Sequence, residues 1–133
     1  EDLKYCYLNE FDKQMIETIK SVTKFSTAPI VKIWDNNDDQ VLAFMRKDLL
    51  FVFNFSPVNS YSGYGLIVPR GSYVTEITTD DAEFGGFNRI DKSIEHFTLP
   101  DPLYKKYRKE WLKLYLPART AQVLRIVKNK KTK

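Results

Sequence analysis

The sequence predicts a mainly β protein: an antiparallel β-sandwich of seven or eight strands with Greek-key-like connections, preceded by one helix. Three observations lead to this fold class. Aromatic residues make up 14% of the 133 residues, and aromatic side chains favour strands. From residue 30 onward, short apolar segments alternate with turn-forming residues. Residues 49–55, LLFVFNF, would be apolar on both faces of a strand, so this strand needs cover on both sides, in the middle of a packed sheet.

The helix is predicted over residues 9–20. Asn9 can cap its first turn, and Glu10 and Asp12 carry charges that suit the positive end of the helix dipole. Residues 21–29 are predicted to be a connector. The apolar side chains of the helix recur at steps of three or four residues and form one stripe that needs a surface to cover; they are Leu8, Phe11, Met15, Ile16 and Ile19.

After the connector, the hydrophobic period changes to two, which is typical of strands. The tight connection between residues 40–46 and 49–55 predicts that these two segments pair as an antiparallel hairpin. A helical turn is predicted at 103–108, within an excursion that follows residue 98. The predicted strands are 30–34, 40–45, 49–55, 64–68, 73–79, 96–98, 111–116 and 119–127.

Charge and composition exclude several partners. The net charge is +4, but Lys128, Lys130, Lys131 and Lys133 lie in the last six residues, and the remaining chain has 17 basic and 17 acidic side chains. A neutral body with a basic tail predicts no nucleic-acid partner. No apolar run reaches the ~18 residues that cross a bilayer, which predicts no membrane partner. Cys6 is the single cysteine and no signal peptide is visible, so we expect a cytoplasmic location.

No catalytic or metal-binding constellation is visible. Asp80, Asp81 and Glu83 cluster, but the ligand spacing of a calcium loop is absent; we interpret them as the end of a strand, with Asp side chains accepting backbone N–H groups. His96 is the only histidine, so a zinc site or a catalytic triad is not expected. The sequence therefore predicts no catalytic residue, no metal and no cofactor in this chain.

Four segments in the same order give a resemblance to a known family. They are YLNEFDKQM (7–15), FVFNFSPVNSYSGY (51–64), TTDDAEFGGFNRID (78–91) and LYLPARTAQVLR (114–125). The last three resemble the C-terminal β-domain of 1,4-α-glucan branching enzymes, of the α-amylase superfamily. The first looks like the last helix of that family's catalytic barrel. The resemblance runs from about residue 4 to residue 127.

The resemblance implies a domain division and a function. Residues 1–28 would be the last barrel helix and a connector, 29–128 the β-sandwich, and 129–133 a basic tail. The parent enzyme would transfer a segment of an α-1,4-glucan to a 6-hydroxyl group, making α-1,6 branches in glycogen by a retaining double displacement without a cofactor. The catalytic carboxylates of the family lie in the barrel, so this chain alone is expected to be inactive. Its expected role is to support the barrel, and it could also guide glucan.

The loop 80–91 is a candidate for facing the catalytic barrel or an α-glucan chain. Adjacent glycines allow backbone freedom or close approach, and the flanking phenylalanines could anchor the loop against another surface. Arg89 could pair with Asp91 or with an acidic partner. The alternative is a loop folded on its own sandwich. The candidate residues are Phe84, Gly85, Gly86, Phe87 and Arg89.

Exposed aromatic rings are the usual platforms for sugars, although aromatic residues in strands more often belong to a core. Trp34, Tyr61, Tyr64, Tyr104 and Tyr107 are the candidates. Tyr61, Tyr64 and Tyr104 are predicted to contact glucan, and Tyr61 and Tyr104 are favoured because both are expected in loops.

Two further functions remain open from the sequence. The chain could be a free-standing α-glucan-binding module, which would bind polysaccharide without a barrel. It could also be a protein-interaction sandwich that dimerises through the helix, with a patch made of Leu8, Phe11, Met15 and Ile19.

Overall fold

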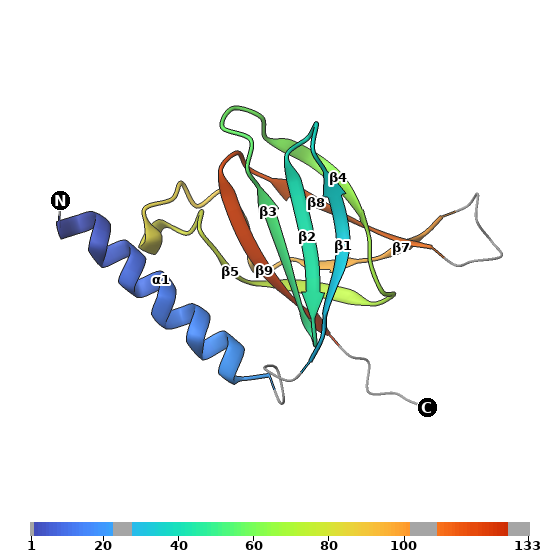
Figure 1. The fold of residues 1–133 in the computed structure, drawn as a ribbon, viewed down its shortest axis with the longest axis horizontal. Coiled ribbons are helices and arrows are strands. Elements are labelled where there is room, and N and C mark those ends of the chain that lie inside the picture. The colour runs from blue at the N-terminus through green and yellow to red at the C-terminus, as the bar shows by residue number, and fades with distance from the viewer. Residues whose placement is uncertain (1, 23–27, 102–108, 128–133) are drawn as a thin grey trace.

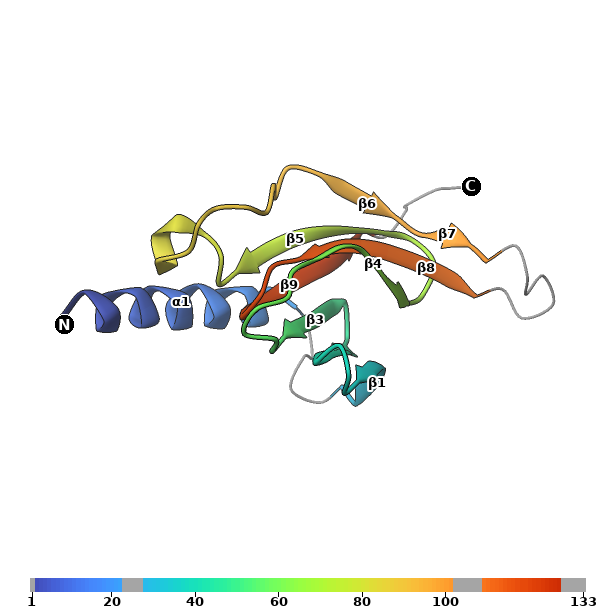
Figure 2. The same cartoon turned by 90° about the horizontal axis from the view of Figure 1, so that it is seen from above.

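The computed structural model describes residues 2–22, 28–101 and 109–127, and side chains of the first helix from Asn9 onward. One helix, α1 (Asp2–Lys20), lies along one side of a two-sheet β structure, as both views show (Figures 1 and 2). Within the described residues there are nine strands and a 3-10 turn, η2 (Ala82–Phe84). All strand pairs are antiparallel. The predicted mainly β, antiparallel two-sheet fold with one helix is therefore confirmed.

The chain crosses between the two sheets. The larger sheet has the order β1-β2-β3-β9-β5-β6 and the smaller has the order β4-β8-β7. The strands are β1 (Ile30–Asn36), β2 (Val41–Arg46), β3 (Leu49–Asn54), β4 (Tyr61–Ile67), β5 (Ser72–Thr78), β6 (Glu95–Phe97), β7 (Leu99–Pro100), β8 (Glu110–Leu116) and β9 (Thr120–Val127).

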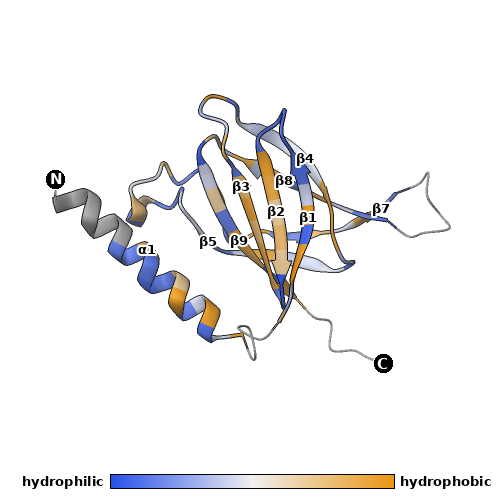
Figure 3. Ribbon diagram, in the orientation of Figure 1, coloured by the Kyte–Doolittle hydropathy of each residue, from blue (hydrophilic) through white to orange (hydrophobic). Residues whose placement is uncertain are grey.

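A hydrophobic core fills the space between the two sheets. Alternate residues of each strand point into it, as the period-two pattern requires, and Figure 3 shows that β2 and β3 are the most hydrophobic part of the ribbon. Buried residues from the larger sheet include Val41, Ala43, Leu50, Val52 and Leu124, and those from the smaller sheet include Leu66, Leu112, Leu114 and Leu116.

The β2–β3 hairpin pairs antiparallel as predicted, in a register that runs from Val41 opposite Asn54 to Arg46 opposite Leu49. Lys47 occupies the left-handed region (φ 58°) in its turn, which is the geometry that tight hairpins favour because it follows the twist of the strands.

The other face of the larger sheet, which we call the helix-side face, carries a second core. Leu49, Phe51, Ile77 and Val123 are buried there beneath Val22, with Phe11 and Met15 of α1 packed against them. The expectation that residues 49–55 are covered on both sides is thus met from Leu49 to Phe51, by the smaller sheet on one side and the second core on the other, but not at Phe55, which is 58% exposed.

The structure differs from the sequence-based prediction at three places. The helix begins at Asp2 and not at Asn9, because good helix formers such as Leu3 and Lys4 extend it upstream, so Asn9 is no cap. Tyr61 starts β4 and does not lie in a loop. The short strand β7 was not predicted; Pro100, which lacks an N–H, is tolerated because β7 is an edge strand. The predicted helical turn at 103–108 lies outside the described residues.

Candidate functional site

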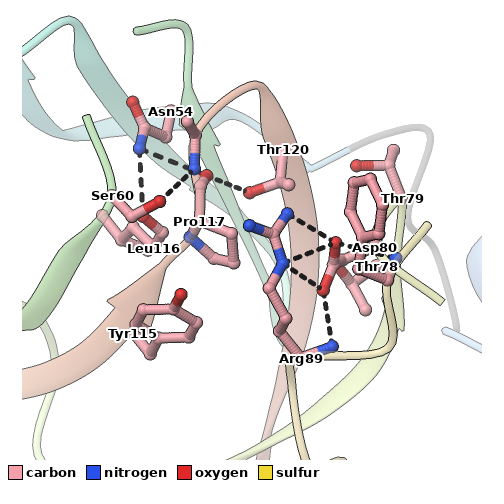
Figure 4. A network of polar contacts seen from close by, with 12 residues as sticks. Asn54, Ser60, Thr78, Thr79, Asp80, Arg89, Tyr115, Leu116, Pro117 and Thr120 are labelled. Carbon is pink, nitrogen blue, oxygen red and sulfur yellow. Dashed lines mark hydrogen bonds and ion pairs between the residues drawn. The ribbon is translucent and has the colours of Figure 1, made fainter. Parts of the chain in front are cut away.

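The loop after β5 is organised by Asp80, which is only 2% exposed. Its carboxylate accepts hydrogen bonds from Arg89 Nη2 (2.7 Å), Arg89 Nε (3.2 Å) and the backbone N–H groups of Arg89 (2.7 Å) and Phe87 (3.3 Å), and Figure 4 shows the pair from close by. Burial by itself raises the pKa of Asp80, but the bonds from Arg89 and Phe87 outweigh it and hold the pKa below its ordinary value. Asp80 therefore remains ionised and holds the two ends of the loop together.

The partner of Arg89 is thus Asp80. Asp91, which the sequence offered as a candidate partner, instead accepts a hydrogen bond from the backbone N–H of Ser93 (2.9 Å). The interpretation of Asp80 as a strand-end residue that satisfies backbone N–H groups is confirmed.

Glycine is favoured at positions 85 and 86 for two different structural reasons. A Cβ on Gly86 would lie 2.2 Å from the backbone carbonyl group of Asp80, so no larger residue fits without moving the backbone. Gly85 ends η2 with a φ of +85° and donates its N–H to Ala82, in the left-handed conformation that glycine adopts most easily. The predicted close approach at the glycine pair holds for Gly86.

One side of the loop packs on α1. The ring of Phe84 contacts the ring of Phe11 edge to face, with centroids 5.1 Å apart, and Gln14 Nε2 donates a hydrogen bond to Glu83 Oε2 (3.0 Å). Phe87, by contrast, is 79% exposed. The loop that was predicted to face the barrel therefore contacts α1, the segment that resembles the last barrel helix.

Four phenylalanines form a continuous row across the helix-side face. Successive ring centroids are 4.9 Å apart for Phe51 and Phe44, 5.8 Å for Phe44 and Phe53, and 5.6 Å for Phe53 and Phe55. The row starts at the buried Phe51 and ends at Phe55, which is 58% exposed. A groove of about 340 Å³ lies at the exposed end and is lined in part by Phe53, Phe55 and Arg119. This phenylalanine row leads from the core to the surface.

Sequence reasoning missed the role of Asn54, the buried amide at the end of β3. Its Nδ2 donates to the carbonyl oxygens of Leu116 (3.0 Å) and Pro117 (3.2 Å), which Figure 4 shows beside it, and to that of Asn59 (2.9 Å). Its Oδ1 accepts the N–H of Ser56 (3.0 Å). Asn54 thereby ties β3 to the β8–β9 turn. The one polar residue in an otherwise apolar strand was the available signal, because a buried amide needs partners.

The predicted aromatic candidates Trp34, Tyr61 and Tyr64 meet where β1 and β4 approach, and we call this cluster the aromatic seam. Trp34 Nε1 donates to the hydroxyl of Tyr64 (2.9 Å), which donates to Asp39 Oδ2 (2.7 Å). The hydroxyl of Tyr61 donates to the carbonyl oxygen of Asp39 (2.9 Å). Burial and then the bond to Asp39 raise the pKa of Tyr64 to about 12. The rings are half-buried, and both hydroxyls already have partners within the protein.

The remaining candidate residues either lie outside the described residues or make structural contacts. Tyr104 and Tyr107 lie outside the described residues. Asp81 forms an ion pair with Lys92 (2.8 Å), and His96 is half-buried, where burial lowers its pKa. Among the residues that the structure describes, no three His, Cys, Asp or Glu side chains gather as a metal site, and no helix is long and apolar enough to span a membrane.

Comparisons with known proteins agree with this fold. The family described as "Alpha amylase, C-terminal all-beta domain" matches residues 33–127. The 1,4-alpha-glucan-branching enzyme of Saccharomyces cerevisiae is 42% identical over 123 residues, and the match covers 92% of this chain and 17% of that protein. The enzyme of the same name from Candida glabrata is 40% identical over 124 residues, with 92% and 17% covered.

A plant protein shows a similar relationship. "1,4-alpha-glucan-branching enzyme 1, chloroplastic/amyloplastic" of Pisum sativum is 41% identical over 102 residues, which cover 74% of this chain and 12% of that protein. The chain therefore spans about a sixth of the length of the two fungal relatives, and less of the plant one.

Proposed function

This chain belongs to the family of α-amylase C-terminal all-β domains, and from that premise we propose that it is the C-terminal domain of a 1,4-α-glucan branching enzyme. Relatives of that name match nearly the whole chain, and in each of them the match covers a small part of a longer protein. The activity is accordingly proposed for the longer polypeptide.

The proposed reaction moves a segment of an α-1,4-linked glucan to a 6-hydroxyl group. Retaining glycoside chemistry uses two carboxyl groups about 5 Å apart, one as nucleophile and one as acid and base. In this domain the buried carboxylates Asp80 and Asp81 are paired with Arg89 and Lys92, so they serve structure. The nucleophile and the acid would come from the rest of the polypeptide, and no cofactor is needed.

The domain's own role is to support the catalytic part of the same polypeptide. This role is inferred from the larger sheet, which has an apolar core on each of its two faces. The helix-side face is apolar enough to hold a core, yet α1 covers only part of it, and the phenylalanine row continues to the exposed Phe55. Most of the length of the relatives lies outside the matched region, which makes the catalytic barrel the natural occupant of this face.

We assign α1 to the edge of that barrel. The matched stretch of 123 residues in the yeast relative is longer than the β domain, residues 33–127, and so extends beyond it. Phe11 and Met15 face the sandwich, while Ile16 is exposed. A helix with apolar residues on two sides suits a position between two packed bodies.

A cytoplasmic location and a part in glycogen synthesis complete the proposal. The part in glycogen synthesis is inferred from the family resemblance, and the location from a chain with a single cysteine. Fractionation of cells that express the full-length polypeptide tests the location.

The activity is tested on the full-length polypeptide with linear α-1,4-glucan as substrate. Proton NMR should show α-1,6 linkages appearing as α-1,4 linkages disappear, whereas the 133-residue chain alone should produce none. A full-length polypeptide that forms no α-1,6 linkage would overturn the proposed reaction.

A further inference from the structure

The exposed ring of Phe87 is displayed from a fixed backbone. Phe87 donates its N–H to Asp80 Oδ1 (3.3 Å), and Asn88 donates its N–H to the carbonyl oxygen of Asp80 (2.6 Å). Asp80 is itself held by Arg89. An aromatic side chain on such a loop loses less conformational entropy on binding than one on a free loop tip. Phe87 is therefore preorganised for contact with a ligand.

The surroundings of the ring match what a pyranose offers. The guanidinium carbon of Arg89 lies over the Phe87 ring, 5.1 Å from its centroid, in a cation–π contact. Because Phe87 is 79% exposed, the rest of the ring is open to solvent. A sugar ring presents an apolar C–H face that packs on an aromatic ring. Arg89, held by Asp80, covers one face of the Phe87 ring, and the opposite face is the one a sugar would meet.

The loop lies next to the helix that is assigned to the barrel. Phe84 and Glu83 attach the loop to Phe11 and Gln14, near the middle of α1 (Asp2–Lys20), and Figure 1 shows the loop beside the helix. In an α/β barrel the helices form an outer ring around the strands. With α1 as the last barrel helix, the loop stands beside the outer wall of the barrel.

We propose that Phe87 is a binding residue for the α-1,4-glucan chain outside the catalytic centre. The ring would stack on a glucose unit of the chain through the face opposite Arg89, and hold a long chain beside the barrel. This inference rests on the proposed function, because it needs both the barrel and the glucan substrate. It assigns to Phe87 a role in substrate binding and none in bond breaking.

The test uses the full-length polypeptide with three variants. Phe87→Ala removes the ring, Phe87→Trp keeps an aromatic surface, and Val58→Ala is the matched control, since Val58 is also 79% exposed on a loop. For Phe87→Ala we expect KM for long linear α-1,4-glucan to rise about three- to tenfold while kcat stays within about twofold. KM for a short linear glucan that ends before Phe87 should not change. Phe87→Trp should restore the wild-type KM, and Val58→Ala should keep it.

The outcomes separate this inference from the proposed function. An unchanged KM for long glucan in a Phe87→Ala enzyme that still forms branches would overturn the inference alone. A wild-type polypeptide without branching activity would overturn the proposed function and this inference with it. Equal rises in KM for long and short glucans would also contradict a site outside the catalytic centre. Retardation of the same variants by glycogen in native gels provides a second readout that does not depend on turnover.

Discussion

Asp80 and Arg89 form a two-point ion pair at the end of β5, with Arg89 Nη2 2.7 Å from Asp80 Oδ1 and Arg89 Nε 3.2 Å from both carboxylate oxygens. The pair closes the loop that contains η2, and η2 carries the phenylalanine that packs on α1. One ion pair thus links the sandwich to the helix.

We expect Asp80→Asn to lower the free energy of unfolding by about 1–2 kcal/mol, because the buried Asp80 loses its charge-assisted hydrogen bonds while Arg89, 35% exposed, stays partly solvated. Urea denaturation followed by circular dichroism measures the change. Asp91→Asn is the matched control, since Asp91 is exposed and its side chain bonds locally to Ser93, and it should leave the urea midpoint unchanged. Equal urea midpoints for wild type and Asp80→Asn would contradict this role for the ion pair.

The same pair should make stability depend on pH in acid. The pKa of Asp80 is lower in the folded protein than its ordinary value, so its ionised form stabilises the fold. This stabilisation is fully present above the pKa of the unfolded carboxyl, about 3.9, and is lost as pH falls through the lower folded pKa. The difference in unfolding free energy between wild type and Asp80→Asn should therefore shrink below about pH 4. A difference that stays constant from pH 6 to pH 3 would show that the charge is not responsible.

The hydroxyl of Tyr64 should stabilise the aromatic seam, because it accepts from Trp34 and donates to Asp39. Tyr64→Phe leaves both partners unsatisfied, and we expect it to cost about 1–2 kcal/mol of unfolding free energy. A double-mutant cycle with Trp34→Phe measures the coupling of the pair. Two single changes that simply add would indicate that the hydrogen bond contributes nothing.

Contact between the aromatic seam and glucan stays a prediction. Electrophoresis of the 133-residue chain in native gels with and without glycogen tests it. The hydroxyl of Tyr61 is engaged with Asp39, so a contact with sugar would use the ring. Glycogen should then retard the wild type and Tyr61→Phe equally and Tyr61→Ala less. A wild type with unchanged mobility would leave the seam as a purely structural cluster.

Local patterns predicted much of the fold. The hairpin of residues 41–54 followed from alternation and a short turn, and the two-sided cover of β3 followed from an apolar run without a polar face. Tyr61 was placed in a loop because Ser60, Ser62 and Gly63 surround it. Its strand conformation depends on pairing with Leu116, distant in the sequence, and local composition does not report that pairing.

The candidate site was predicted less completely, for the same reason. The loop and its glycines were recognisable from the sequence. Asp91, however, was named as a candidate partner of Arg89 because the two residues are close in sequence. Its real partner, Asp80, is selected by the three-dimensional path of the loop. Asn54 joins backbone carbonyl groups from separate segments, and a long-range network of this kind has no periodic signature.

The final prediction concerns the phenylalanine row and the part of the polypeptide proposed to cover it. Phe55 is 58% exposed in this domain, and it should be buried in the full-length enzyme if the catalytic barrel packs on the helix-side face. Phe55→Asp should then destabilise the full-length polypeptide by about 2–3 kcal/mol, since it removes a buried ring and introduces a charge. The same change in the 133-residue chain should cost less than about 1 kcal/mol.

Val58→Asp is the control for this comparison, because Val58 is at least as exposed and lies in the loop beyond the row. Thermal unfolding of both variants in both polypeptides gives four melting temperatures. A drop confined to Phe55→Asp in the full-length polypeptide would support docking at this face. Equal behaviour of Phe55→Asp in the two polypeptides would mean that the row remains in water, and the barrel would have to contact another surface of the sandwich.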